Sequence, residues 1–221
     1  MTDFILLISI VLLLVISQIA ISRAYNKYSV EAANLSYTGE DIVKNMLMAS
    51  AVHDVEIRMI NGTLNDHYNS NNKTISLSKH SCNKNTIASI AVAAHETGHA
   101  IQDHENYSML KLRKFLGPIC SFCSRFVWIA IFLGILFQYF NLITIGLVLM
   151  GVTILFQVVT LPVEFDASKR AINYLNTLGY DEYTIKGVKK MLTAAAFTYV
   201  ASTLGALLQM LRLVLRFTRD D

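Results

Sequence analysis

The chain has 221 residues, of which 53% are hydrophobic and only 16% are charged, and its formal net charge is +3. This composition is too apolar for an ordinary soluble domain. The small net charge and the lack of a basic arm with interleaved aromatic residues argue against a nucleic-acid partner.

Residues 4–21 are almost wholly apolar. About 18 residues approach the length of about 20 that a helix needs to cross the hydrocarbon core of a bilayer. A cleaved signal peptide would instead begin with a basic region. Here Asp3 precedes the apolar run, and Arg23 and Lys27 follow it. The positive-inside rule therefore predicts that residues 1–22 form an uncleaved membrane anchor and that the chain after it lies in the cytoplasm.

Residues 23–115 form the only long polar stretch and are expected to fold as a small α+β domain. Thr38 is typical of a helix start, and apolar residues recur at helical spacing through residues 42–52. Asn61 and Gly62 are typical of a hairpin turn and are expected to join the first two strands. Three short strands are predicted, at residues 55–60, 64–68 and 74–78.

At residues 95–99 the sequence reads His-Glu-Thr-Gly-His, within a stretch that is predicted to be helical. Residues four apart lie on one face of a helix, so His95 and His99 can reach one metal ion together. Glu96 lies beside them, close enough to take a proton from a water that the metal activates. This pattern predicts a zinc site, and a hydrolytic zinc site needs a third protein ligand.

The surroundings of this motif favour a metal site over a chance pattern. Residues 86–94 are small and apolar, which indicates that the helix is packed. Burial of two histidines and a glutamate without partners would be costly, and a shared metal ion removes that cost. The helix is expected to be capped by Asn85 or Thr86 and to run to about Glu105.

The three cysteines give no comparable signal. Cys120 and Cys123 have the spacing of a metal or redox pair, but no second pair completes a four-thiolate site and the flanking residues are apolar. They are interpreted as packing residues on one helix face. Together with Cys82 they do not indicate a disulfide framework.

Two apolar segments, residues 116–137 and 142–161, are joined by four uncharged residues and predict a transmembrane hairpin over residues 116–161. Arg125 interrupts the first segment. It is expected to extend toward the membrane surface or to face the helix bundle, rather than to act in catalysis.

Residues 162–192 contain a polar helix that begins at Pro162 and follows the hairpin, and residues 193–221 form an apolar helix with a basic tail. The flanks of this last helix conflict, because both ends are basic and the positive-inside rule cannot place both in the cytoplasm. The sequence therefore predicts three to four membrane helices. The basic residues concerned are Lys186, Lys189, Lys190, Arg212, Arg216 and Arg219.

The third zinc ligand is expected from another element than the motif helix. A metzincin site would require a glycine and a histidine where this chain has Gln102 and Glu105. The hairpin returns the chain to the membrane face that it left, so the helix after Pro162 can meet the histidines. Glu164 is the best candidate there, with Asp166 as the alternative. A carboxylate at that position could also simply complement the helix dipole.

Five segments carry a resemblance to a known family that runs over nearly the whole chain: residues 66–68, 75–78, 91–102, 160–168 and 194–201. The two longest read Ala-Val-Ala-Ala-His-Glu-Thr-Gly-His-Ala-Ile-Gln and Thr-Leu-Pro-Val-Glu-Phe-Asp-Ala-Ser. The chain resembles the bacterial membrane zinc metallopeptidases of the YugP type, which are similar in plan to the gluzincin membrane proteases of the HtpX group.

The resemblance implies that His95, His99 and Glu164 bind one zinc ion and that Glu96 is the catalytic base. No other cofactor is implied. One position departs from the broader group, which has an aspartate four residues after its glutamate ligand. This chain has Ser168 there and Asp166 two residues after the glutamate, so the partner that orients the ligands is not given by the resemblance.

The fold expected overall is an α+β membrane protein, mainly helical, with a small gluzincin-like catalytic domain that contains a short sheet. The expected function is that of a multi-pass plasma-membrane zinc endopeptidase with its catalytic domain in the cytoplasm, which cleaves peptide bonds of membrane or misfolded proteins. Substrate is expected to pair with an edge strand at residues 75–78. Gly98 is expected to leave room near the metal. Tyr199 is either an oxyanion donor or, more in keeping with an apolar helix, a packing residue.

Three alternatives remain at this point. A non-catalytic membrane adaptor could keep a structural zinc site, but it would not need Glu96. An intramembrane protease of the site-2 type would place the motif in a spanning helix, whereas the apolar run before His95 is too short to span. A membrane-anchored binding domain without metal is the third. The substrate's identity and the oligomeric state are not given by the sequence.

Overall fold

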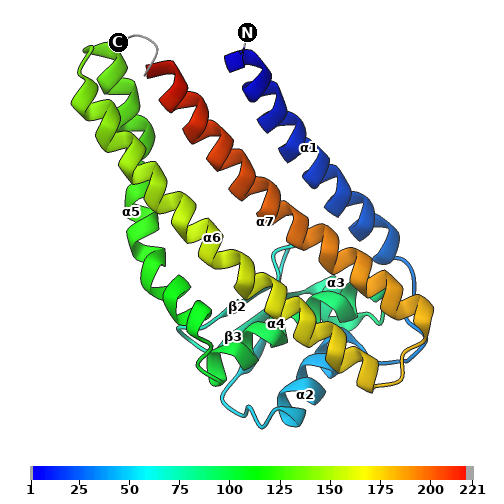
Figure 1. Ribbon diagram of the computed structural model, residues 1–221. Helices are drawn as coiled ribbons and strands as arrows, with labels where there is room; N and C mark the ends of the chain where they lie inside the picture. Colours follow the sequence, from blue (N-terminus) through cyan, green and yellow to red (C-terminus); the bar gives the residue numbers. More distant parts are fainter. Residues whose placement is uncertain (1, 218–221) are drawn as a thin grey trace. The chain divides into compact units, whose positions relative to one another are not determined.

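The structure is a computed structural model that describes residues 2–217. Among these residues, four helices are long and apolar enough to cross a membrane (Figure 1). They are α1 (Thr2–Tyr28), α5 (Ser108–Leu136), α6 (Phe140–Thr177) and α7 (Glu182–Phe217). With a short sheet, they confirm the expected α+β membrane protein. Arg219, part of the expected basic tail, lies outside the described residues.

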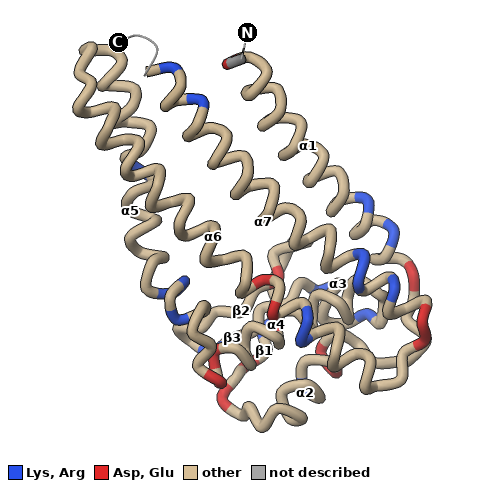
Figure 2. The backbone as a smooth tube through the Cα atoms, in the orientation of Figure 1, with Lys and Arg blue, Asp and Glu red and all other residues tan. Residues whose placement is uncertain are grey.

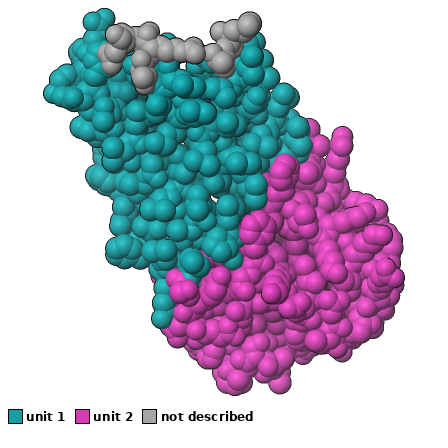
Figure 3. Space-filling view, viewed as in Figure 1, with its two compact units in different colours: residues 1–18, 109–162, 198–221 teal, residues 19–108, 163–197 magenta. Residues whose placement is uncertain are grey.

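The chain divides into two compact units (Figure 3). Unit 1 comprises residues 1–18, 109–162 and 198–221, and unit 2 comprises residues 19–108 and 163–197. The long helices α1, α6 and α7 contribute long stretches to both units, whereas α5 contributes only its first residue, Ser108, to unit 2. The domain boundaries expected from the sequence stay a prediction.

Unit 1 consists of apolar stretches of the four long helices, along which charged residues occupy few positions (Figure 2). Its buried cluster includes Val127 of α5, Ile154 of α6 and Leu213 of α7. The segment after residue 193 is thus part of a continuous helix rather than a separate surface segment. The guanidinium of Arg212 lies 2.7 and 3.0 Å from the two carboxylate oxygens of Asp3. Asp3 thus compensates the positive charge of Arg212, one of the basic residues that prevent the positive-inside rule from assigning an orientation to α7.

Unit 2 contains a three-stranded sheet of β1 (Glu56–Ile60), β2 (His67–Asn69) and β3 (Thr74–Ser78). Its order is β1-β3-β2, with β1 parallel and β2 antiparallel to β3. The prediction that Asn61 and Gly62 form a hairpin between the first two strands was therefore wrong. A parallel pair needs a crossover of about a dozen residues, and residues 61–73, with β2 among them, provide that crossover.

β3 is the central strand, and all five of its residues are buried. It pairs with β1 along its whole length and with β2 at residues 74–76, so the expectation that residues 75–78 form an edge open to substrate was also wrong. β1 and β2 are the edge strands of this sheet. Ile75 and Leu77 of β3 are fully buried and anchor the sheet to the core of unit 2.

The helices of unit 2 begin where the capping residues predict. Thr38 precedes α2 (Gly39–Ala49) with a complete capping box, in which Thr38 and Asp41 exchange side-chain and backbone hydrogen bonds. After the short α3 (Lys79–Asn83), Thr86 caps α4 (Ile87–His104). α2, α3 and β3 all contact α4. The helix that carries the His-Glu-Thr-Gly-His motif is therefore packed inside unit 2, as its small apolar residues predicted.

α6 runs through Pro162 without a break, so no separate helix starts there. Proline lacks the N–H that would bond to the carbonyl of residue 158, and the usual result is a kink or a break. Here the helix continues on both sides of the proline. The apolar segment before Pro162 and the polar segment with Glu164 are thus parts of one helix.

Candidate metal centre

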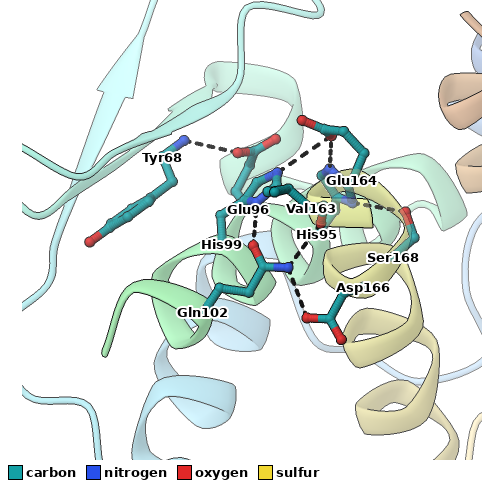
Figure 4. A network of polar contacts seen from close by, with 9 residues as sticks. All are labelled: Tyr68, His95, Glu96, His99, Gln102, Val163, Glu164, Asp166 and Ser168. Atoms are coloured by element: carbon teal, nitrogen blue, oxygen red, sulfur yellow. Dashed lines mark hydrogen bonds and ion pairs between the residues drawn. The ribbon is translucent and has the colours of Figure 1, made fainter. Parts of the chain in front are cut away.

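The two histidines of the motif lie on one face of α4, at the end of a buried run of small residues. The Thr86 side chain accepts a hydrogen bond from the N–H of Ser89, which fixes the start of the helix. Two to four turns later, the rings of His95 and His99 meet edge to face, with their centroids 4.8 Å apart. His99 is buried, and His95 retains slightly more exposure. Both rings point toward α6 (Figure 4).

Glu164 of α6 brings a carboxylate to both rings. Its Oε2 lies 3.3 Å from His95 Nε2 and 3.5 Å from His99 Nε2. The side chain of Glu164 is only 4% exposed. Burial of an ionised carboxylate is costly unless a positive charge compensates it. Two imidazoles and a carboxylate directed at one point, each offering an atom within 4.8 Å of the others, meet that requirement with a metal ion.

The distances from Glu164 Oε2 to the two histidine nitrogens fit zinc. Zinc bound at about 2.0–2.1 Å to tetrahedral ligands holds any two of them about 3.3–3.4 Å apart. The two separations between histidine nitrogen and glutamate oxygen, 3.3 and 3.5 Å, match this spacing. Two histidines and one carboxylate are also a donor set that catalytic zinc uses, and it leaves one coordination position for substrate or water.

Asp166, the alternative third ligand, lies in a different set of contacts. Its Oδ2 accepts a hydrogen bond from Gln102 Nε2 at 2.8 Å and from Arg170 Nε at 2.6 Å. It is not part of the group of three residues that could hold a metal. The geometry therefore brings Glu164, and not Asp166, to the histidines.

Glu96, the candidate base, is held by the sheet. The backbone N–H of Tyr68 in β2 donates a hydrogen bond to Glu96 Oε2 at 2.8 Å (Figure 4). Burial raises the pKa of Glu96 above its ordinary value, while the charges of His95 and His99 act in the opposite direction. The hydrogen bond from Tyr68 keeps Glu96 Oε2 in place beside the two histidines.

Tyr68 is itself fixed by a second contact. Its hydroxyl donates a hydrogen bond to Asp103 Oδ2 at 2.8 Å, and Lys73 Nζ lies 2.7 Å from the same oxygen. Burial, and then this hydrogen bond, raise the pKa of Tyr68. β2 is thus tied to α4 at both Glu96 and Asp103, and sequence reasoning did not identify either link.

The second nitrogen of each histidine ring also has a partner. Ser168 Oγ lies 3.2 Å from His95 Nδ1, and Gln102 Oε1 lies 3.0 Å from His99 Nδ1. Partners of this kind orient metal-binding histidines. Sequence reasoning named Ser168 only as a departure from a pattern and Gln102 only as evidence against another class. The contact of Gln102 could have been predicted from its position, because Gln102 follows His99 by three residues and therefore lies on the same face of α4.

Gly98 makes room for a helix rather than for the metal. A Cβ at this position would lie 2.7 Å from the carbonyl oxygen of Ala167 and 3.1 Å from its Cα, both in the backbone of α6. Backbone atoms cannot move away as a flexible side chain can, so any larger residue would push α4 and α6 apart. The close approach of these helices is what lets Glu164 reach the histidines.

Two other sequence candidates lie outside the centre. Tyr199 is on α7 in unit 1 and is 38% exposed, whereas the residues of the centre belong to unit 2. Cys120 and Cys123 are free thiols on α5, and Cys123 is buried. The burial of Cys123 agrees with the packing interpretation, which stays a prediction for Cys120 and Tyr199.

Comparison with known proteins places the same segments in one family. A family model described as "putative neutral zinc metallopeptidase" matches residues 3–218. The "Putative membrane protease YugP" of Bacillus subtilis (strain 168) is 36% identical over 208 residues, which cover 93% of this chain and 92% of that protein. No solved structure matches this chain significantly.

Proposed function

This chain belongs to the family described as putative neutral zinc metallopeptidases, and on that premise we propose that it is a zinc-dependent endopeptidase of the membrane. The membership confirms the resemblance drawn from the motifs. The four apolar helices agree with a membrane protein. The roles of individual residues and the class of substrate are our proposals.

His95, His99 and Glu164 would hold one zinc ion, which when bound supplies a Lewis acid that lowers the pKa of a water and polarises the peptide carbonyl. Glu96 accepts a proton as that water attacks the carbonyl carbon, and then delivers the proton to the leaving amine. The hydrogen bond from the Tyr68 N–H to Oε2 orients the Glu96 carboxylate for this role.

One observation carries this proposal: an intact Glu96 lies beside a three-residue cluster whose spacing fits zinc. A non-catalytic adaptor with a structural zinc site would need the three ligands but not a buried carboxylate next to them. Structural zinc sites also use four protein ligands in most cases. Both points favour an enzyme over the adaptor.

We further propose that substrate pairs with the outer edge of β2. The N–H of Tyr68 points to Glu96, so this edge of the strand faces away from β3 and toward the candidate centre. Because the Tyr68 N–H is already bound to Glu96, an extended peptide added there would pass the centre with its own N–H donating to the Tyr68 carbonyl. Peptides N-methylated at alternate amides lose these bonds and are expected to be cleaved more slowly. Equal cleavage of methylated and unmethylated peptides would contradict this binding mode.

Removal of the metal tests the function as a whole. Purified full-length protein in lipid nanodiscs is expected to cleave a quenched fluorescent peptide, to lose this activity with a zinc chelator and to recover it when one equivalent of zinc is added. The dialysed protein without chelator is the control. Activity that persists after complete removal of zinc, measured by atomic emission, would exclude the proposed mechanism.

We propose that the protein lies in the plasma membrane with unit 2 in the cytoplasm. The support is the charge pattern of α1, in which Asp3 precedes the apolar run and Arg23 and Lys27 follow it. Met59 of unit 2 is exposed and provides a reporter position. In a background without the native cysteines, a Met59→Cys variant is expected to react with a membrane-impermeant thiol reagent only after cells are opened. Labelling of intact cells would reverse the orientation.

A further inference from the structure

Gln102 connects both metal-binding elements of unit 2. It lies on α4, three residues after His99, and it is fully buried. Its Oε1 is 3.0 Å from His99 Nδ1. Its Nε2 lies 2.8 Å from the backbone oxygen of Val163 and 2.8 Å from Asp166 Oδ2, both on α6 (Figure 4). Three hydrogen-bond partners thus surround one neutral amide.

These partners determine which way the amide faces. The carbonyl oxygen of Val163 can only accept a hydrogen bond. The carboxylate oxygen of Asp166 also acts as an acceptor, because it receives the guanidinium N–H of Arg170 at 2.6 Å. Both therefore require the NH₂ group of Gln102. The amide oxygen is left to face His99, as Figure 4 shows.

The orientation of the amide fixes the proton of His99. An amide oxygen has no hydrogen to donate, so the hydrogen bond to His99 exists only if Nδ1 carries the proton. A neutral imidazole with its proton on Nδ1 has its lone pair on Nε2. Nε2 is the atom that lies 3.5 Å from Glu164 Oε2. The ring is thus held in the tautomer that can bind a metal next to Glu164.

We propose that Gln102 is a positioning residue of the metal centre, which sets the tautomer of His99 and fixes the turn of α6 that carries Glu164. Val163 directly precedes Glu164, so the hydrogen bond to its carbonyl fixes the helix where the carboxylate emerges. An amide suits this position because it can accept from His99 and donate to α6 at once. A carboxylate could only accept.

The network continues to the surface of unit 2 and gives Asp166 a role. Arg170 donates to Asp166 Oδ2 and also lies 2.8 Å from Glu105 Oε2. Asp166 therefore orients Gln102, which orients His99. Ser168 at 3.2 Å is the corresponding partner of His95.

Four variants of the full-length protein test the proposal by zinc affinity, measured in competition with a chromogenic chelator. Gln102→Met keeps the length of the side chain but removes all three hydrogen bonds, and it is expected to weaken zinc binding by about 10- to 100-fold. Gln102→Glu alone is expected to weaken it too, because two carboxylates would face each other across a 2.8 Å contact.

A reversed pair separates this role from simple packing. In Gln102→Glu combined with Asp166→Asn, the repulsion between the two carboxylates is removed and the asparagine amide can donate to the new carboxylate, which still accepts from His99. The atom that donates then takes the place of the oxygen that accepted from Arg170, and Arg170 keeps its contact with Glu105. This double variant is expected to bind zinc more tightly than Gln102→Glu alone. Thr97→Val is the matched control, since Thr97 is equally buried on α4 and its hydroxyl donates a hydrogen bond to the Ala93 carbonyl of the same helix.

Cobalt in place of zinc gives a spectroscopic readout of ligand geometry. The visible spectrum of the cobalt protein is expected to change in Gln102→Met and to stay unchanged in Thr97→Val, with thermal unfolding recorded for both. Equal zinc affinity of these two variants would overturn the proposal. So would a double variant that binds zinc no better than Gln102→Glu alone.

The inference rests on the proposed function only for its catalytic consequence. If the expected ranking of zinc affinities holds but the wild-type protein cleaves no peptide, Gln102 keeps its role and the peptidase proposal fails. If the wild-type protein is active and the ranking does not hold, only the role of Gln102 fails.

Discussion

Replacement of Glu96 by glutamine is expected to lower the rate of peptide hydrolysis by about 10²- to 10⁴-fold, which is the usual contribution of general acid–base catalysis. Glutamine has nearly the same shape, and its amide oxygen can still accept the hydrogen bond from the N–H of Tyr68. It cannot accept a proton from water at neutral pH. Glu96 is not among the three residues that could hold the metal, so one equivalent of zinc should remain bound.

The measurement combines turnover of a fluorescent peptide with the zinc content of the same sample. Glu56→Gln is the control, because it makes the same chemical change on an exposed strand position of unit 2. Turnover close to wild type in Glu96→Gln would remove Glu96 from the mechanism. The variant also reports on substrates: membrane or misfolded proteins that accumulate in cells with Glu96→Gln, but not with Glu56→Gln, are candidates for cleavage.

Replacement of Glu164 by alanine is expected to have a different signature, in which zinc and activity are lost together. Only two histidines of the proposed ligand set would remain, and Asp166, the alternative ligand, has its Oδ2 bound to Gln102 and Arg170. Loss of a ligand should weaken zinc binding by more than the roughly 10- to 100-fold that follows from loss of an orienting partner. Zinc per chain after dialysis measures the effect.

Asp166→Asn is the comparison that separates the two candidate ligands. Its oxygen can still accept from Gln102, so most of the bound zinc is expected to remain. If instead Asp166→Asn loses its zinc and Glu164→Ala keeps it, the third ligand is Asp166, and Glu164 only forms hydrogen bonds with the histidines. Far-UV circular dichroism of both variants checks that helices are retained.

The long elements of this fold could be predicted because their signals are local. Apolar length identified the membrane helices, and Thr38 and Thr86 identified two helix starts to within a residue. The order of the strands could not be predicted in this way, because it depends on contacts between residues that are distant in the sequence. β1 pairs with β3 across thirteen intervening residues, and nothing in the Asn61-Gly62 turn distinguishes a crossover from a hairpin. The continuity of α6 through Pro162 was not predicted, because proline is a strong local signal for a helix break. In the folded protein the helix continues through it.

In the candidate site, too, features that depend on local sequence could be predicted and contacts between distant segments could not. The spacing of the motif predicted that His95, His99 and Glu96 lie close together. The expectation that the hairpin ends at the membrane face where it began pointed to Glu164 as the third ligand. Their contacts with neighbours could not be predicted, because Tyr68 N–H, Gln102 and Ser168 reach the centre only through the packing of β2 and α6 against α4. Gly98 was noticed, but the atom that requires it, the carbonyl oxygen of Ala167, belongs to a distant part of the sequence.

The order of the proposed ligands along the chain matters during biosynthesis. A nascent chain carries both histidines of α4 before α5 exists, whereas Glu164 is translated only after the whole hairpin of α5 and α6 up to Pro162. On the proposed ligand set, an unfinished chain that ends before Glu164 therefore lacks one zinc ligand, and we expect it to hydrolyse no peptide. We expect ribosome-bound intermediates to be inert toward their neighbours, with hydrolysis starting only once the hairpin has been made.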